Sequence, residues 1–422
     1  MSVPDPGTGK EVLQRRLTTG DAVIIGLGSM IGAGIFSSFS PAAAAAGAGL
    51  LVGLVVAGVV AFCNATSSAQ LAAQYPTSGG TYVYGRERIG EWAGFFAGWS
   101  FVVGKTASSA AMALTFATYA VPDPWVRPTA IVAVLVLTVV NTMGITRTAF
   151  VTRVLVATSL VALAVTVVIG FSSTAPSAAL PGPTVTGYGV LQAAGFLFFA
   201  FAGYARVATL GEEVVNPARA IPRAITIALT ITLLVYALVA ASALHALGPV
   251  GLSGTPAPLA AVASLASGPW NGLVRVGAAA AALGALLAMI AGIGRTSLAM
   301  ARNRDLPGWF SAVHPRFSTP HRAEIGLGLI VCALVAVADL RGAIGFSSFG
   351  VLLYYFVANV AALTQDSTHR RYPRVLPVAG LLGCLVLVAT LPLRSILIGA
   401  AVLVVGLIYR GIRLRVGRGA SA

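Results

Sequence analysis

The sequence predicts an all-α membrane protein, and three observations support this fold class. Of the 422 residues, 57% are hydrophobic and only 9% are charged, whereas about 25% of the residues of an ordinary soluble domain are charged. Apolar runs of about 20 residues, long enough to cross a bilayer as a helix, recur along the whole chain. Short basic loops separate these runs. We therefore expect one polytopic helical unit.

The apolar runs predict twelve transmembrane helices. The expected ranges are 21–46, 48–72, 92–119, 127–144, 153–172, 190–211, 224–247, 273–299, 324–340, 343–364, 375–391 and 394–410. They divide the chain into an amino-terminal tail (1–20), a first five-helix set (21–172), a second five-helix set (190–364), two further helices (375–410) and a carboxyl-terminal tail (411–422). We expect no cleavable signal peptide, because the first residues are polar with scattered charges.

The net charge is +15, and the distribution of the Lys and Arg residues along the chain indicates the membrane topology. Of the 27 Lys and Arg residues, 21 fall in the tails and in the loops that share one side of the membrane with them. The opposite side carries only Arg127, Arg275, Arg341 and Arg394. By the positive-inside rule we expect a protein of the cytoplasmic membrane with both termini cytoplasmic. Basic clusters are then topology signals compatible with anionic lipid, and we expect no nucleic-acid partner.

The stretch GLGSMIGAGIF at residues 26–36 resembles a dinucleotide-binding loop. That fold needs an acidic residue about 20 positions after the glycines, but no Asp or Glu lies between Asp21 and Glu87. Glycines midway along a membrane helix have two other interpretations, which are close helix packing and an interruption that exposes the backbone. A second interruption is expected near Gly203 and Arg206 in the sixth helix. If the two five-helix sets are inverted repeats, the two interruptions meet near the middle of the membrane.

Cysteine and histidine indicate no further chemistry. The three cysteines, Cys63, Cys332 and Cys384, all fall inside predicted helices without metal-ligand spacing. The four histidines have no carboxylate or second histidine at catalytic spacing. We therefore expect no metal, no cofactor and no enzymatic activity. A channel or a receptor would need a continuous polar pore or a soluble domain, and the sequence predicts neither.

The chain resembles the amino acid-polyamine-organocation transporters over nearly its whole length. The resemblance rests on GDAVIIGLGSMIGAGIF in the first predicted helix, on FFAFAGYARVATLGEEVVNPARAIPRAI in the sixth helix and its loop, and on GRTSLAMARNRDLP closing the eighth. It implies a five-plus-five inverted-repeat fold with discontinuous helices 1 and 6, two extra carboxyl-terminal helices, and transport by alternating access. It also implies an amino acid site between helices 1, 3, 6 and 8.

The resemblance places the substrate carboxylate at the backbone N–H groups of Gly32, Ala33 and Gly34. The start of a half-helix attracts an anion because its N–H groups are unpaired and its dipole is positive there. On this basis we expect Gly34→Val to abolish binding without disturbing the fold. The other implied contacts are the carbonyl groups of Met30, Phe199 and Ala202 for the ammonium, the Phe199 ring as a gate, and Thr106 and Met289 along the pocket. Ordinary core packing is the alternative for Phe199.

Two positions depart from the family pattern. Many proton-coupled relatives carry a lysine on the fifth helix, where this chain has Ser159, and its one membrane-embedded lysine is Lys105 on the third helix. Lys105 lies about 20 Å along that helix, too deep for its side chain to reach the surface, so we expect it to be the proton-coupling cation. Binding of backbone carbonyls is its structural alternative. Arg206 is the second departure, and an ion pair with Glu212 or Glu213 is favoured over substrate contact, which gives these residues a structural or gating role.

The expected pocket contains no acidic residue, so a cationic side chain would lack a counter-charge. The sequence therefore favours small or apolar neutral amino acids, moved by proton symport or by exchange. A transporter of an acidic amino acid or of another organic amine is an alternative. A second alternative is an amino acid sensor that keeps a transporter fold without transporting. The expected partners are an amino acid, a proton and membrane lipid.

Overall fold

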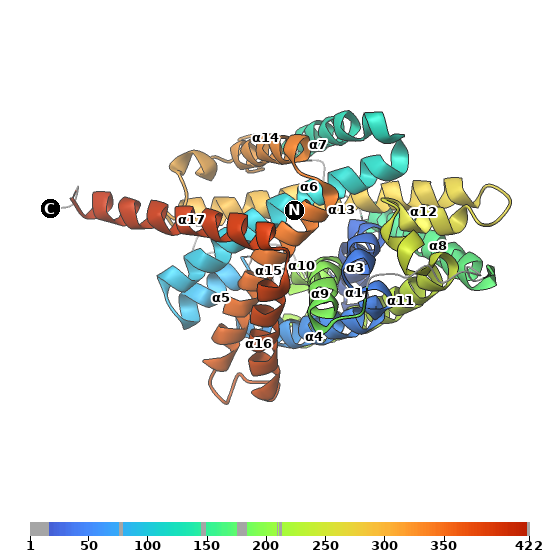
Figure 1. The fold of residues 1–422 in the computed structure, drawn as a ribbon. Helices are drawn as coiled ribbons and strands as arrows, with labels where there is room; N and C mark the ends of the chain where they lie inside the picture. Colours follow the sequence, from blue (N-terminus) through green and yellow to red (C-terminus); the bar gives the residue numbers. More distant parts are fainter. Residues whose placement is uncertain are drawn as a thin grey trace.

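The computed structural model describes residues 17–75, 79–144, 149–174, 184–208, 210 and 213–419. Within these residues the chain is helical and contains no β-strand (Figure 1). One isolated parallel bridge joins Leu17 to Val214. Nine helical segments in the described part of the chain are long and apolar enough to cross a membrane.

Each of the twelve predicted ranges overlaps a helix. In chain order, the helices in these ranges are α1 (Thr19–Met30), α2 (Ala33–Ser37) and α3 (Phe39–Ala46) in the first range, then α4 (Leu50–Gln74), α6 (Glu91–Ala120), α7 (Val126–Thr142), α8 (Ala149–Ser172), α9 (Gly187–Phe201) with α10 (Ala205–Ala208), α11 (Pro217–Ser253), α13 (Trp270–Arg302), α14 (His321–Val337), α15 (Leu340–Leu363), α16 (Val375–Thr390) and α17 (Leu393–Gly419). Short elements connect them: α5 (Thr81–Arg88), α12 (Pro258–Ala263) and the 3-10 turns η1 (Gly47–Gly49), η2 (Asp123–Trp125), η3 (Ala202–Tyr204) and η4 (Gly308–Ser311).

Three of the twelve ranges correspond to helices that fall outside the nine apolar spans. Helix α14 has 17 residues and α16 has 16, which makes both short for a bilayer crossing. Helix α6 has 30 residues, but its composition is less apolar because it carries Lys105 and several Ser and Thr side chains. These polar side chains are buried against neighbouring helices rather than exposed to lipid, as expected for a central helix.

The boundary predicted at residue 340 is wrong by three residues. Helix α14 ends at Val337, and Ala338 has the extended conformation (φ −88°, ψ 152°). Asp339 then caps α15, with its side chain accepting a hydrogen bond from the Gly342 N–H. The apolar pattern continues across this turn, so composition alone could not locate it, whereas the cap ends one helix and begins the next.

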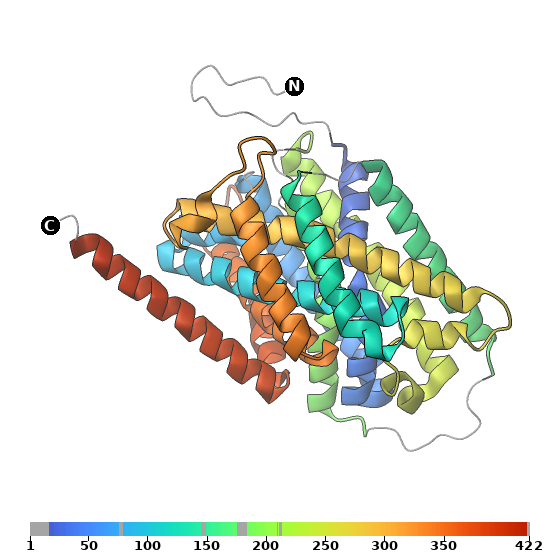
Figure 2. The same ribbon diagram turned by 90° about the horizontal axis from the view of Figure 1, so that it is seen from above.

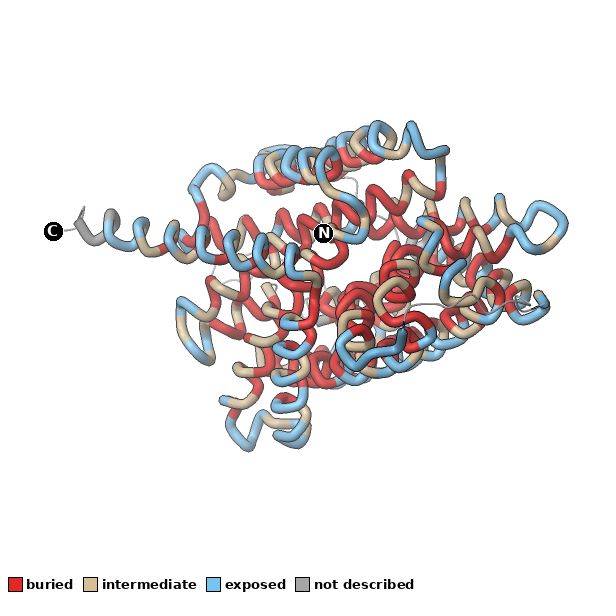
Figure 3. Tube along the Cα trace, viewed as in Figure 1, coloured by how far each residue is buried: buried red, intermediate tan, exposed pale blue. Residues whose placement is uncertain are grey.

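The helices that surround the centre of the molecule are buried, and the outer helices present apolar side chains outward. Figure 3 shows buried residues along α6, α9 and α15 and many exposed residues along α17. On α4, Val52, Val55 and Val59 are 57%, 60% and 56% exposed. This spacing of three and four residues makes one exposed stripe on the helix. An exposed apolar stripe of this kind is suited to contact with lipid.

The end of the molecule at which α1 begins is closed by contacts between distant segments; we call this end the amino-terminal face. The Leu17 N–H donates to the Glu213 carbonyl at 3.0 Å, and the Val215 N–H donates to the Leu17 carbonyl at 2.9 Å. Asp21, in the first turn of α1, forms a 2.9 Å ion pair with Arg153 of α8. These contacts hold the start of α1 against both α8 and the segment that follows α10. Figure 2 shows α17 extending away from the other helices toward the carboxyl terminus.

Candidate functional site

The first predicted helix is interrupted between Met30 and Ala33. Ile31 has φ −77° and ψ 60°, the conformation at the centre of an inverse γ-turn, and the Gly32 N–H donates to the Met30 carbonyl at 2.8 Å. The helix restarts at Ala33 as α2, so the N–H groups of Ala33 and Gly34 have no carbonyl partner within their own helix. Ser38 has the right-handed helical conformation and links α2 directly to α3. The interruption expected in the first helix is therefore present.

The interruption in the sixth predicted helix is of a different kind. Helix α9 ends at Phe201, tightens into the 3-10 turn η3 and continues as α10. Ala202 has φ −64° and ψ 1°, outside the α-helical region, and the hydrogen-bonding pattern tightens there. This local narrowing of the helix includes Gly203, near which the sequence predicts a second interruption. The described part of α10 ends at Ala208.

Two glycines allow the first and sixth predicted helices to cross at a very short distance. A Cβ atom at Gly34 would lie 2.5 Å from the Cα of Ala200 on α9, and a Cβ atom at Gly203 would lie 2.1 Å from the carbonyl oxygen of Ser29 on α1. Both approaches are to backbone, which cannot move aside as a flexible side chain can. Both glycines thus serve close packing, and Gly34 also lies just after the interruption of the first predicted helix. Gly34→Val would displace α9, so the expectation that it leaves the fold undisturbed is wrong.

A small buried cavity lies where the interrupted helices meet. Its volume is about 20 Å³, room for about one water molecule, which needs about 10–15 Å³ of such space. Seven predicted site residues line it: Met30, Gly32, Ala33, Gly34, Lys105, Phe199 and Met289. Ser29, Ser108, Met112, Ala200 and Gly203 complete its lining, and sequence reasoning missed these as site residues. The helices must separate before a solute the size of an amino acid can enter.

Lys105 reaches this cavity from α6. Its side chain is 4% exposed, and its Nζ donates to the carbonyl oxygen of Ala202 at 3.3 Å. The Tyr355 hydroxyl of α15 donates to the same carbonyl at 3.4 Å. The ion pairs formed by the described residues do not include Lys105. An ammonium group has three N–H donors, so the Ala202 carbonyl satisfies only one of them.

The Met30 carbonyl also has protein partners. The Tyr236 hydroxyl of α11 lies 2.6 Å from this oxygen and 3.0 Å from the carbonyl oxygen of Ala200. Its single proton can serve one acceptor at a time, so Tyr236 connects α1 and α9 by alternative hydrogen bonds. Sequence reasoning missed Tyr236 and Tyr355. The available signal was the presence of tyrosines inside apolar helices, because a buried hydroxyl group needs a partner.

The remaining predicted residues lie beside the cavity or away from it. The Thr106 hydroxyl donates to the Val102 carbonyl of its own helix at 2.6 Å, and neither Thr106 nor Ala202 lines the cavity. Phe199 packs in an apolar cluster with Ala111, Phe196, Ala343 and Ile344. This packing agrees with both interpretations of Phe199, a gate and a residue of the ordinary core.

Arg206 lies on α10, where the charges of Arg295 and Glu213 act on it. Glu212 lies outside the described residues, so the ion pair of Arg206 with Glu212 or Glu213 stays a prediction. The Ser159 hydroxyl donates to the Leu155 carbonyl within α8 at 2.8 Å. Across the described ranges, no three His, Cys, Asp or Glu side chains gather in a way that could hold a metal ion.

Two features of this structure are those of a multi-pass membrane transporter. Apolar helices of membrane-spanning length surround a buried cavity, and interrupted helices form part of its wall. The sequence model of the amino acid permease family matches residues 21–417. The chain belongs to this family.

Relatives agree with the family assignment. An uncharacterized transporter of Mycobacterium tuberculosis is 57% identical over 412 residues, which cover 97% of this chain and 93% of the relative. The branched-chain amino acid permease BcaP of Bacillus subtilis is 26% identical over 440 residues, covering 95% of this chain and 93% of the relative. Cationic amino acid transporter 6 of Arabidopsis thaliana is 30% identical over 385 residues, covering 83% of this chain and 65% of the relative.

Proposed function

We propose that this chain is a secondary transporter that moves amino acids by alternating access around the cavity between α1, α2, α6, α9 and α13. The observation that carries the proposal is the meeting of both interrupted helices at one buried cavity, whose wall includes the backbone of Gly32, Ala33 and Gly34. Unpaired backbone at membrane depth is stable only where protein or a bound solute satisfies it. A zwitterionic amino acid can satisfy N–H and carbonyl groups at once.

The carboxylate of the substrate binds at the start of α2. The N–H groups of Ala33 and Gly34 are the first of this helix, and α3 follows after Ser38, so the positive end belongs to a longer helical segment. The Gly32 N–H is already bonded to the Met30 carbonyl. Ala33 and Gly34 are therefore the principal donors in this conformation. Gly32 has no side chain and so lets the substrate approach the backbone closely.

The ammonium of the substrate binds carbonyl groups of Met30, Phe199 and Ala202. Lys105 already donates to the Ala202 carbonyl, so substrate and lysine compete for one acceptor. Loss of a proton from Lys105 weakens its hold on this oxygen and frees it for the substrate ammonium. Substrate binding therefore favours release of the Lys105 proton, so this competition couples entry of the substrate to movement of a proton in the opposite direction.

The lining of the cavity supports a small or apolar neutral substrate. Met30, Met112, Met289 and Phe199 line the cavity, and no carboxylate does. Methionine side chains adapt their shape readily, which suits a cavity that must expand. The branched-chain specificity in the name of the Bacillus subtilis relative agrees with this class. For a cationic side chain, the ammonium of Lys105 is an unfavourable neighbour.

An acidic amino acid is the second candidate substrate. The observation that favours it is that Lys105 lines the cavity, where it could pair with a side-chain carboxylate. Its bond to the Ala202 carbonyl would then be replaced by an ion pair.

The proposed architecture has twelve membrane helices. Two inverted five-helix repeats form the transport core, with both termini in the cytoplasm and the chain in the cytoplasmic membrane. Helices α16 and α17 are added at the carboxyl-terminal end. The reciprocal approach of Gly34 to Ala200 and of Gly203 to Ser29 supports this two-fold relation. Arg206 and Glu213 are structural or gating groups on the amino-terminal face.

The test is uptake of labelled amino acids by the purified protein in proteoliposomes. We expect uptake of neutral amino acids such as alanine or leucine, and a dependence of the rate on a pH gradient. Saturable glutamate uptake without neutral uptake would support the acidic alternative. Binding of an amino acid without any flux would identify the sensor alternative and contradict transport.

A further inference from the structure

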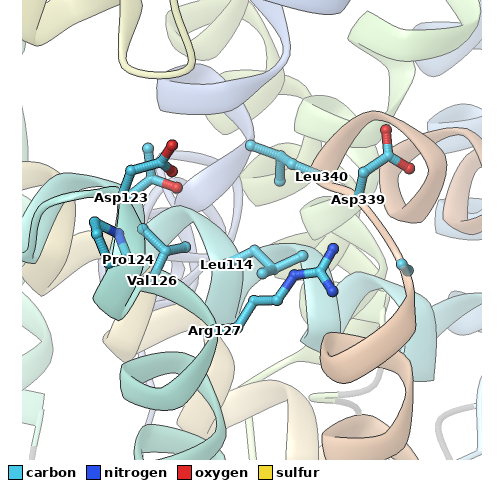
Figure 4. A pocket seen from close by; sticks show the side chains of 9 residues that line it. Leu114, Asp123, Pro124, Val126, Arg127, Asp339 and Leu340 are labelled. Atoms are coloured by element: carbon cyan, nitrogen blue, oxygen red, sulfur yellow. The ribbon is translucent and has the colours of Figure 1, made fainter.

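A second pocket opens on the face opposite the amino-terminal face. Its volume is about 420 Å³, within the usual size of small-molecule sites. It lies between the end of α6, the turn η2, the start of α7 and the turn from α14 to α15 (Figure 4). Its charged lining residues are Asp123, Arg127 and Asp339.

The two carboxylates are an unusual feature of this face. The chain has only 12 Asp and Glu residues, against 27 Lys and Arg residues. Asp123 and Asp339 come from loops far apart in the sequence, yet both line this one pocket. Figure 4 shows them on opposite sides of the pocket, with the guanidinium group of Arg127 between them.

These three charged groups are exposed and form no ion pair with one another, and two of them are held by hydrogen bonds to the backbone. Arg127 Nη1 donates to the Ala336 carbonyl at 2.6 Å, and Asp339 Oδ1 accepts from the Gly342 N–H at 3.3 Å. The ion pairs among the described residues include neither Asp123, Asp339 nor Arg127. Each group therefore keeps hydrogen-bonding capacity toward the pocket.

The pocket and the central cavity are related through one apolar cluster. Leu340 lines the pocket and packs against the apolar cluster that contains Phe199. Phe199 in turn lines the central cavity. Residues in or against one apolar cluster therefore line both spaces.

We propose that this pocket is an entry site that binds the charged backbone of an α-amino acid before it passes Phe199. Arg127 binds the carboxylate, and Asp123 and Asp339 bind the ammonium group. The net charge of the three groups is −1, so the site accepts neutral or cationic side chains and repels acidic ones. This inference rests on the proposed function and adds a second substrate site to it.

The test compares uptake kinetics of Asp123→Asn, Asp339→Asn and the double variant with the unaltered chain, in cells or right-side-out vesicles. Asn caps a helix as well as Asp does, so Asp339→Asn keeps the start of α15. We expect the double variant to raise KM about fivefold, the effect of a lost ion pair of ordinary surface strength. The maximal rate stays unchanged, because the central cavity is unaltered. The KM for efflux, measured from the amino-terminal face, also stays unchanged.

Arg127→Gln and Arg394→Gln are the matched pair of charge controls. Both remove one positive charge from the same face, but Arg394 does not line the pocket. We expect Arg127→Gln to raise KM and Arg394→Gln to leave it unchanged. An unchanged KM in the double Asn variant, or equal effects of the two Arg variants, would overturn the entry site. Failure of the unaltered chain to take up any amino acid would instead overturn the proposed function.

Discussion

The Nζ of Lys105 lies 3.3 Å from the carbonyl oxygen of Ala202, so a lysine of α6 holds the backbone at the narrowed part of the sixth predicted helix. The same lysine lines the central cavity. It therefore contacts both the place where substrate is expected and a carbonyl expected to bind it. Any change in the charge or position of Lys105 therefore changes the hydrogen bond to that carbonyl.

Lys105 should be essential for uptake driven by a pH gradient. We expect Lys105→Gln to abolish gradient-driven uptake in proteoliposomes, because the side chain no longer exchanges a proton. Lys105→Arg should do the same, because a guanidinium group stays protonated. Counterflow exchange should survive in Lys105→Gln. Gradient-driven uptake at the original rate and pH dependence in Lys105→Gln would rule out the coupling role.

The substrate carboxylate should be required for binding. Because Gly34 packs directly on α9, the clean test alters the ligand and leaves the protein unchanged. An amino acid methyl ester lacks the anion that the start of α2 attracts, and we expect it to compete at least about tenfold less well than the free acid, a difference of about 1.4 kcal/mol. Competition against labelled substrate measures this. Equal competition by ester and acid would show that the N–H groups of α2 do not bind the carboxylate.

The ion pair between Asp21 and Arg153 should favour the conformation that is closed at the amino-terminal face. It joins α1 to α8 at 2.9 Å, and an exposed pair of this kind contributes up to about 1 kcal/mol. We expect Arg153→Gln to increase the reactivity of a cysteine introduced at Ser29, which lines the central cavity. The measurement is the rate of labelling by a maleimide added from that face, in a background without the native cysteines.

Arg302→Gln is the control for this experiment, because Arg302 is exposed and its side chain forms no ion pair with another described residue. It should leave the labelling rate unchanged. Slower labelling in Arg153→Gln would show that the ion pair favours the open conformation instead.

A buried ionic cluster near the amino-terminal face should stabilise the fold. Asp305 and Arg410 are 5% and 4% exposed and form an ion pair, and the Tyr82 hydroxyl donates to Asp305 Oδ2 at 2.7 Å. Burial and the adjacent carboxylate raise the pKa of Tyr82, so its hydroxyl stays protonated and able to donate. Asp305→Asn removes the buried carboxylate of this pair and leaves Arg410 with only the exposed Glu91, 3.4 Å from its Nη2. Breaking a buried ion pair costs about 3–5 kcal/mol. We expect a clearly lower Tm in detergent.

Asp366→Asn is the matched control, because Asp366 pairs with Arg88 at 3.7 Å while its side chain is 69% exposed. Its loss should cost less than about 1 kcal/mol. Equal shifts of Tm in Asp305→Asn and Asp366→Asn would contradict the structural importance of the buried cluster.

The sequence by itself determined the class of protein, the positions of the helices and the interruption of the first helix. These features depend on short stretches of sequence. A bilayer crossing requires about 20 apolar residues, and glycines in the middle of a helix weaken it whatever it packs against. The prediction at residue 340 failed because the apolar pattern continues through the turn that Asp339 caps. In the sixth helix, the 3-10 turn η3 contains Gly203, which packs against the carbonyl oxygen of Ser29.

Only the tertiary structure decided which side chains face the cavity and what holds them. Lys105, Ser108 and Met112 share one face of α6, at spacings of three and four residues, while Thr106 points away from the cavity. Tyr236 and Tyr355 reach the site from helices α11 and α15, far along the chain. Asp123 and Asp339 likewise meet only when the loops come together. In lipid, apolar side chains face both neighbouring helices and the bilayer, so hydrophobicity does not reveal which helices pack together.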